Sequence, residues 1–163
     1  MDLTTSSGPL TANEQIARMA EDWPGFRAVH STPWSIVWRG ELRPLCCAYE
    51  VQICYYAFAV PVLGIVPLVG GDDRLIRPYV EILAPTLTPR SPSAKDAVPH
   101  VFQNRICRDL PRLCLHLPDE WNQSMAISES IVGWTGDWLV AYEGWRATGE
   151  WWAGGHGTER RAL

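Results

Sequence analysis

The chain changes its periodicity at one segment, Arg112-Leu-Cys-Leu-His-Leu-Pro-Asp-Glu-Trp121. Before it, short runs rich in aromatic and branched side chains are separated by turn-forming residues, which is typical of strands. After it, apolar side chains recur every three or four residues, as they do on one face of a helix. We therefore expect a sheet before this segment and helical structure after it.

One helix and a sheet are expected before the segment. The helix should run from Thr11 or Asn13 to about Ala20, because Ile16 and Met19 have helical spacing behind a possible cap. A Trp-Pro-Gly triplet then ends the pattern. The following runs predict an antiparallel meander of about four strands: Ala28–Val29, Trp34–Trp38, Cys47–Phe58, Arg77–Leu83 and Val98–Phe102.

Two helices are expected after the segment, and they should share an apolar and aromatic face that extends to Trp145. Gly133 and Gly136 each cost roughly 1 kcal/mol inside a helix, and Thr135 offers a fresh amino-terminal cap between them. We therefore expect a break near these residues, with Gly149 as the final stop. An amino-terminal helix, a meander, a loop and carboxy-terminal helices together predict the α+β class.

Length and composition fit one globular domain. The 163 residues are 47% apolar and 20% charged, which excludes fibrous and disordered classes. We expect one domain over residues 11–152, with flexible tails at 1–10 and 153–163. The net charge is −4 and Lys95 is the only lysine, so the chain offers no broad basic face and we expect no nucleic acid as a partner.

One uncharged stretch, Val51–Gly71, approaches the length of a membrane span. Prolines and glycines interrupt it and its first residues alternate as in a strand, which predicts a buried strand followed by a Pro/Gly-rich loop. The amino terminus lacks a basic region followed by an unbroken apolar run, so we expect no secretory signal. A cytoplasmic protein without membrane contact follows, and its five cysteines, which include no Cys-x-x-Cys pair, should be free thiols.

The segment around Cys114 resembles the active-site segment of ubiquitin-conjugating (E2) enzymes, in which an Ile/Leu-Cys-Leu triplet precedes a Trp by several residues. The order of elements is similar as well, and the resemblance covers about residues 11–150. It implies a UBC-like fold: an amino-terminal helix, a four-stranded antiparallel meander, an active-site loop and carboxy-terminal helices. The run from Trp138 to Trp152 is similar to bacterial E2-like proteins of anti-phage operons that signal with cyclic oligonucleotides, the CBASS operons.

The resemblance implies that Cys114 is the catalytic residue. Eukaryotic E2 enzymes carry His-Pro-Asn before the cysteine, whereas here the nearest asparagine is the more distant Asn104. Bacterial relatives often use a His two residues after the cysteine, which here is His116. Independently, residues i and i+2 of an extended segment share a side, so the two side chains can approach each other. A charged His116 would lower the pKa of the thiol, and a neutral one would take a proton from an incoming amine.

Each of these residues has a simpler interpretation. Cys46, Cys47 and Cys54 are expected to be packing residues, because cysteine is among the most often buried side chains. Cys107 shares the segment but lacks the motif, and His100 and Asn104 are interpreted as structural, although either could assist Cys114. A zinc site built from His100, Cys107, Cys114 and His116 has no recognised spacing, so we expect no metal and no cofactor. The nine tryptophans could form a binding platform, but their spacing also fits a packed helix face.

Three functions remain open. The first is an E2-like transferase in which Cys114 holds the carboxy terminus of a partner protein as a thioester and passes it to an amine or thiol. If the resemblance to defence proteins holds, that partner is a nucleotidyltransferase of the cGAS/DncV-like type, and antiviral signalling is what the transfer regulates. No E1-like adenylating domain is expected in these residues. The alternatives are a catalytically inactive E2-like interaction domain and a Trp-rich ligand-binding domain.

Overall fold

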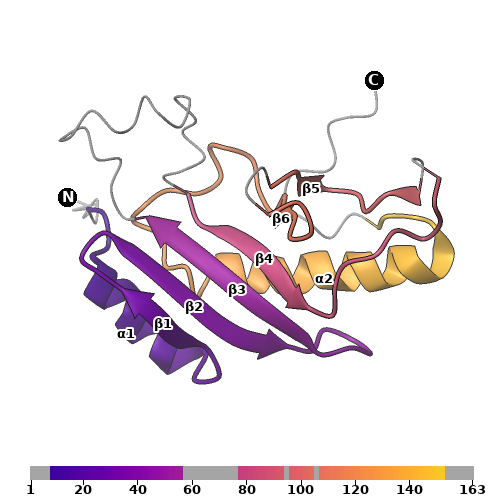
Figure 1. The fold of residues 1–163 in the computed structure, drawn as a ribbon. Coiled ribbons are helices and arrows are strands. Elements are labelled where there is room, and N and C mark those ends of the chain that lie inside the picture. Colours follow the sequence, from indigo (N-terminus) through magenta and orange to yellow (C-terminus); the bar gives the residue numbers. More distant parts are fainter. Residues whose placement is uncertain (1–7, 57–76, 94–95, 105–106, 153–163) are drawn as a thin grey trace, which may run out of the picture.

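The structure is a computed structural model that describes residues 8–56, 77–93, 96–104 and 107–152 (Figure 1). The expectations for most of both tails and for the Pro/Gly-rich loop after residue 56 lie outside the described residues. Within the described part of the chain, no helix is long and apolar enough to cross a membrane.

The first helix, α1 (Ala12–Asp22), begins at a reciprocal cap. The Thr11 hydroxyl accepts from the Glu14 backbone N–H at 3.3 Å, and the Glu14 carboxylate accepts from the Thr11 backbone N–H at 2.7 Å. Two backbone donors that a helix start leaves unpaired are thereby satisfied. The buried Gln15 then ties α1 to the chain before the last helix, since its amide bonds the Met125 carbonyl and the Ile127 N–H. The predicted first helix is confirmed.

The sheet is antiparallel and has the strand order β1-β2-β3-β4-β6-β5. Each run predicted as a strand overlaps one strand, but the sheet has six strands where about four were expected, and the sixth comes from the start of the Arg112–Trp121 segment. The strands are β1 (Arg27–Ser31), β2 (Ser35–Leu42), β3 (Tyr49–Tyr56), β4 (Tyr79–Ala84), β5 (Val101–Phe102) and β6 (Arg112–Leu113). The short strand β6 lies between β4 and β5, which places the start of the segment inside the sheet.

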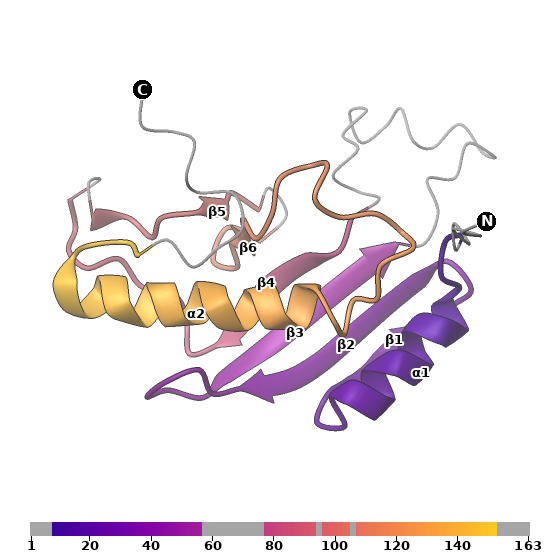
Figure 2. The ribbon, with the colours of Figure 1, turned by 180° about the vertical axis from the view of Figure 1, so that it is seen from behind.

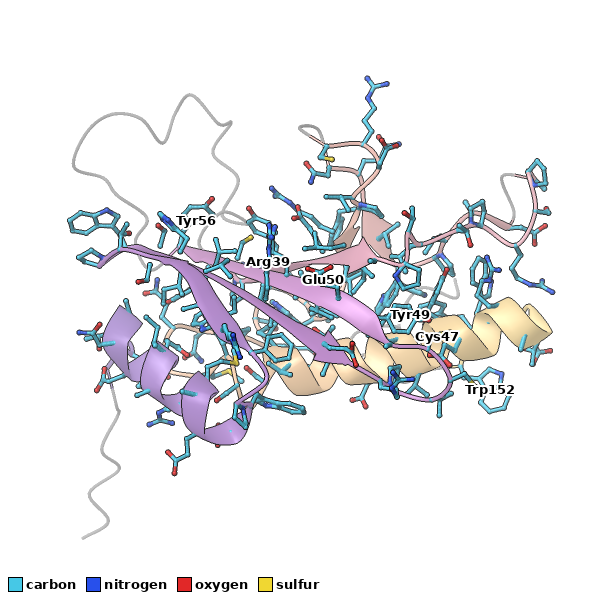
Figure 3. The ribbon with its side chains drawn as sticks, turned by 60° about the horizontal axis from the view of Figure 1, so that its bottom comes forward. Arg39, Cys47, Tyr49, Glu50, Tyr56 and Trp152 are labelled. Atoms are coloured by element: carbon cyan, nitrogen blue, oxygen red, sulfur yellow. The ribbon has the colours of Figure 1, made fainter. Side chains whose placement is uncertain are left out.

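The two faces of the sheet have different characters. Apolar side chains from β2, β3 and β4 form the core on one face, and α1 and the last helix both cover that face (Figures 1 and 2). These core side chains are Ile36, Trp38, Val51, Ile53, Val80 and Ile82. The other face carries polar side chains, and Figure 3 shows Arg39, Glu50 and Tyr56 along it. The alternation along each strand therefore separates a packed face from an open one.

The last helix, α2 (Ile131–Thr148), is a single continuous helix, so the expected break near Gly133 and Gly136 is wrong. Thr135 does not cap a new helix, because it is fully buried and its hydroxyl donates to the Ile131 carbonyl at 2.7 Å. Burial of one long apolar face outweighs the roughly 1 kcal/mol that each glycine costs. The predicted stop is confirmed: Gly149 has φ 86 and its N–H donates to the Trp145 carbonyl.

The tryptophans mostly serve this packing. Trp38, Trp121, Trp138 and Trp145 are all at most 4% exposed and belong to one core cluster, whereas Trp34 and Trp152 are exposed. Core packing, rather than a binding platform, therefore explains most of the described aromatic residues of α2 and the sheet.

The continuity of α2 gives opposite signs for two glycine substitutions. Gly136→Ala should raise the free energy of unfolding by about 0.5–1 kcal/mol, because a Cβ there meets nothing within 4 Å and alanine favours the helix. Gly149→Ala should lower it, because φ 86 disfavours a side chain and a Cβ would also meet the Arg90 guanidinium. Chemical denaturation measures both, and a destabilising Gly136→Ala would contradict an unbroken helix.

Candidate active site

Cys114 lies directly after β6, between two anchored side chains. Leu113 and Leu115 are 5% and 4% exposed and belong to the core, whereas Cys114 is only partly buried. Successive side chains of an extended segment point to opposite sides, so the burial of both leucines turns the Cys114 side chain away from the core. The prediction that the two leucines pack inward is confirmed.

The carbonyl of His100 fixes the backbone at Cys114. It accepts a hydrogen bond from the Cys114 backbone N–H at 2.9 Å and another from the indole N–H of Trp138 at 3.1 Å. Because Trp138 is fully buried on α2, this carbonyl joins the Cys114 segment to the helix that covers the sheet. The His100 ring itself lies 4.9 Å from the ring of Trp151. His100 therefore supports Cys114 through its backbone.

Two contacts hold the imidazole ring of His116, one with an aromatic ring and one with a backbone carbonyl. The ring centroid lies 5.4 Å from that of Trp134 on α2, and Nδ1 lies 2.8 Å from the Leu117 carbonyl oxygen. A carbonyl only accepts, so Nδ1 carries the hydrogen and the neutral ring keeps its free lone pair on Nε2. The Leu117 N–H in turn donates to the Glu120 carboxylate at 2.7 Å, which stabilises the turn that follows.

Burial determines the charge of His116. Loss of solvent is the largest cause that lowers its pKa below the ordinary value of 6.5, with Arg77 adding to it, while the Leu117 hydrogen bond and Glu120 act in the opposite direction. The ring is therefore neutral at pH 7. Of the two roles that the sequence left open, proton acceptance fits this state, and stabilisation of a thiolate by a charged imidazole does not.

Asn104 is buried and its side chain is engaged within the sheet. Its Nδ2 donates to the Glu81 carboxylate at 2.8 Å, and its Oδ1 accepts from the Cys107 backbone N–H at 3.1 Å. Both ends of the amide thus hold parts of the chain in place. Sequence reasoning gave no signal for Glu81, which becomes apparent only when the strands are placed in register.

The other cysteines differ from one another. Cys54 is buried, and loss of solvent is the main cause that raises the pKa of its thiol, as expected for a packing residue. The same expectation is wrong for Cys46 and Cys47, which are exposed in the connection between β2 and β3, where their backbone N–H groups donate to the Glu143 carboxylate. All five cysteines are free thiols. Among the described residues, no three His, Cys, Asp or Glu side chains form a cluster that could hold a metal ion.

The fold is α+β, an antiparallel sheet covered by helices on one face, and a partly exposed cysteine lies in the segment that leads from the sheet to the last helix; this arrangement is compatible with an E2-like fold. The family model described as type II CBASS E2 protein matches residues 15–159, and the chain therefore belongs to the E2-CBASS family. This family assignment confirms the resemblance that the Cys114 segment indicated. No curated protein matches the chain.

The environment of His116 predicts a measurable titration. NMR of the folded protein should give a His116 pKa below 6.5, because the buried ring resists protonation. Trp134→Ala should move this pKa back toward 6.5, since it removes the aromatic ring that covers the imidazole. A His116 pKa above 6.5 in the folded wild-type protein would contradict the effect of burial, and one above 7 would contradict the neutral base.

Proposed function

We propose that Cys114 accepts the carboxy terminus of a partner protein as a thioester and transfers it to an amine or thiol. Membership of the E2-CBASS family supports a conjugating role. The single observation that carries the residue assignment is the position of Cys114, partly exposed between two core leucines. A nucleophile must be accessible and held in place, and this geometry meets both needs.

The first step consumes an activated carboxy terminus, either an acyl adenylate or a thioester on another protein. The Cys114 thiolate attacks the acyl carbon, a carbon–sulfur bond forms, and adenylate or the donor thiolate leaves. In the second step an amine attacks the same carbon, an amide forms, and the Cys114 thiolate leaves. The proton of the attacking amine goes to Nε2 of His116, which is the free lone pair of the neutral ring.

The proposed partner is a nucleotidyltransferase of the same defence operon, and the transfer of its carboxy terminus would regulate the cyclic nucleotide signal. The type II CBASS family supports a partner from such an operon. A catalytically inactive docking domain is the alternative, but docking alone gives no reason to hold a partly exposed cysteine between two buried leucines. A Trp-rich ligand-binding domain has less support, because four described tryptophans are buried in the core.

Substitution of Cys114 tests the nucleophile. When the chain is co-expressed with the proposed partner nucleotidyltransferase and a protein that activates the partner's carboxy terminus, Cys114→Ala should abolish a thiol-sensitive adduct that intact mass spectrometry detects. Cys46→Ala is the matched control, since Cys46 is exposed and lies outside the segment. Cys114→Lys should trap an isopeptide that resists reductant, because an amide does not undergo thiol exchange. A thiol-sensitive adduct on Cys114→Ala would contradict the assignment.

Substitution of His116 tests the proton acceptor. His116→Ala should slow transfer to an amine by roughly 10²- to 10⁴-fold, the usual contribution of a positioned base. Alkylation of Cys114 by iodoacetamide should change little, since a neutral imidazole does not stabilise the thiolate. Slower alkylation that recovers at higher pH would instead indicate a charged His116. If transfer and alkylation both keep their wild-type rates in the folded variant, His116 has no part in the reaction.

A further inference from the structure

A row of polar side chains crosses the open face of the sheet at a single register. Arg39 on β2 pairs with Gln52 on β3, Gln52 pairs with Glu81 on β4, and Glu81 pairs with Arg112 on β6. Side chains directly opposite each other on neighbouring strands share a face and interact. The row therefore ends at Arg112, two residues before Cys114 in the same extended segment.

Glu81 is the centre of this row and is only 6% exposed. Its Oε2 accepts from Gln52 Nε2 at 3.0 Å and its Oε1 accepts from Asn104 Nδ2 at 2.8 Å. Arg112 Nε lies 3.9 Å from the same Oε1, and the Arg112 guanidinium stacks 3.8 Å above the Tyr79 ring. One carboxylate therefore connects β3, β4, β6 and the chain just after β5.

The direction of these hydrogen bonds requires a carboxylate. Arg39 Nε donates to Gln52 Oε1 at 2.9 Å, so the amide nitrogen of Gln52 must face Glu81. The Cys107 N–H donates to Asn104 Oδ1, so the amide nitrogen of Asn104 must face Glu81 as well. A carboxylate accepts on both oxygens, whereas a glutamine at this position would direct its own NH₂ group at one of the two donors.

The backbone alone holds β6 weakly. It has two residues and one registered pair with β4, Glu81 with Arg112. Its pairs with β5 are Leu113 with Val101 and Arg112 with Phe102, and the next residue, Cys114, bonds the His100 carbonyl just before β5. The position of Cys114 thus depends on how β5 and β6 sit against β4. Glu81 contacts Asn104, two residues beyond β5, and Arg112 on β6.

We infer that Glu81 is a positioning residue for Cys114: its buried carboxylate fixes Asn104 beyond β5 and Arg112 on β6, and through them the segment that carries the thiol. This inference rests on the proposed transfer at Cys114. Glu81 acts through its neighbours and takes no part in bond making. A site that must hold reacting atoms in register loses rate when its support shifts, even if the fold survives.

A polarity exchange tests the inference. Glu81→Gln sets an NH₂ group against a donor, and Asn104→Asp sets two carboxylates against each other, so each single variant should lose transfer rate by roughly 10- to 100-fold. In the double variant, the new amide at position 81 donates to the new carboxylate at position 104, which still accepts from the Cys107 N–H. That variant also keeps the wild-type net charge, and it should recover most of the rate.

The control and the second readout separate positioning from general stability. Glu50→Gln makes the same chemical change on the same face of the sheet as Glu81, at an exposed position of β3, and should leave transfer unchanged. Peptide mass spectrometry after brief iodoacetamide treatment gives the alkylation of Cys114 relative to the exposed Cys46. This ratio should change severalfold in the single variants and return in the double variant. A thermal unfolding scan identifies variants that have lost the fold.

The outcomes distinguish this inference from the proposed function. Wild-type transfer and alkylation ratio in folded Glu81→Gln would overturn it, as would a double variant no better than the worse single one. If neither single variant folds, a folded and active double variant supports the inference, and a double variant that is unfolded or inactive overturns it. The alkylation ratio needs no acyl donor. If it follows the exchange while no thioester forms on Cys114, positioning stands and the proposed transfer fails.

Discussion

The burial of Leu113 and Leu115 is the constraint on which the site depends. Each is nearly removed from solvent, and burial of a leucine stabilises a fold by about 1.5–3 kcal/mol. Because the two residues alternate with Cys114 in an extended segment, their packing determines which way the cysteine faces. The same apolar contacts that complete the core therefore also orient the Cys114 side chain.

Polar contacts, together with the two leucines, hold the Cys114 segment in place. The His100 carbonyl joins Cys114 to the buried Trp138 of α2 on one side of the sheet, and the Glu81 carboxylate joins β6 to the neighbouring strands on the other. The cysteine segment is thus held from both faces. His116 is the proposed proton acceptor, because burial lowers its pKa and its Nδ1 is engaged by a carbonyl, which leaves the lone pair of the neutral ring on Nε2.

Local sequence predicts the parts of this structure that depend on local rules. The cap at Thr11, the stop at Gly149 and the inward packing of Leu113 and Leu115 follow from side-chain chemistry within a few residues. The E2-like family follows from the Cys114 segment and the order of elements. These features predict the α+β class and mark Cys114 as the candidate nucleophile before any coordinates are known.

The remaining features depend on contacts between distant residues. A strand of two residues is too short to be predicted from its sequence, so β6 is recognised only by its pairing with β4 and β5. The helix α2 runs through its glycines because one long face of it is buried, Thr135 included, and the burial of Thr135 is not evident from its sequence neighbours. The Glu81 contacts require strand register, and register is set by the assembled sheet.

The most direct test of the account is the intact mass of the wild-type chain isolated after co-expression with the proposed partner nucleotidyltransferase and a protein that activates the partner's carboxy terminus. The account predicts a species whose mass is the sum of the two proteins less one water, which excess thiol reverses and which peptide mapping assigns to Cys114. The absence of any thiol-sensitive adduct, or its assignment to another residue, would contradict a thioester at Cys114.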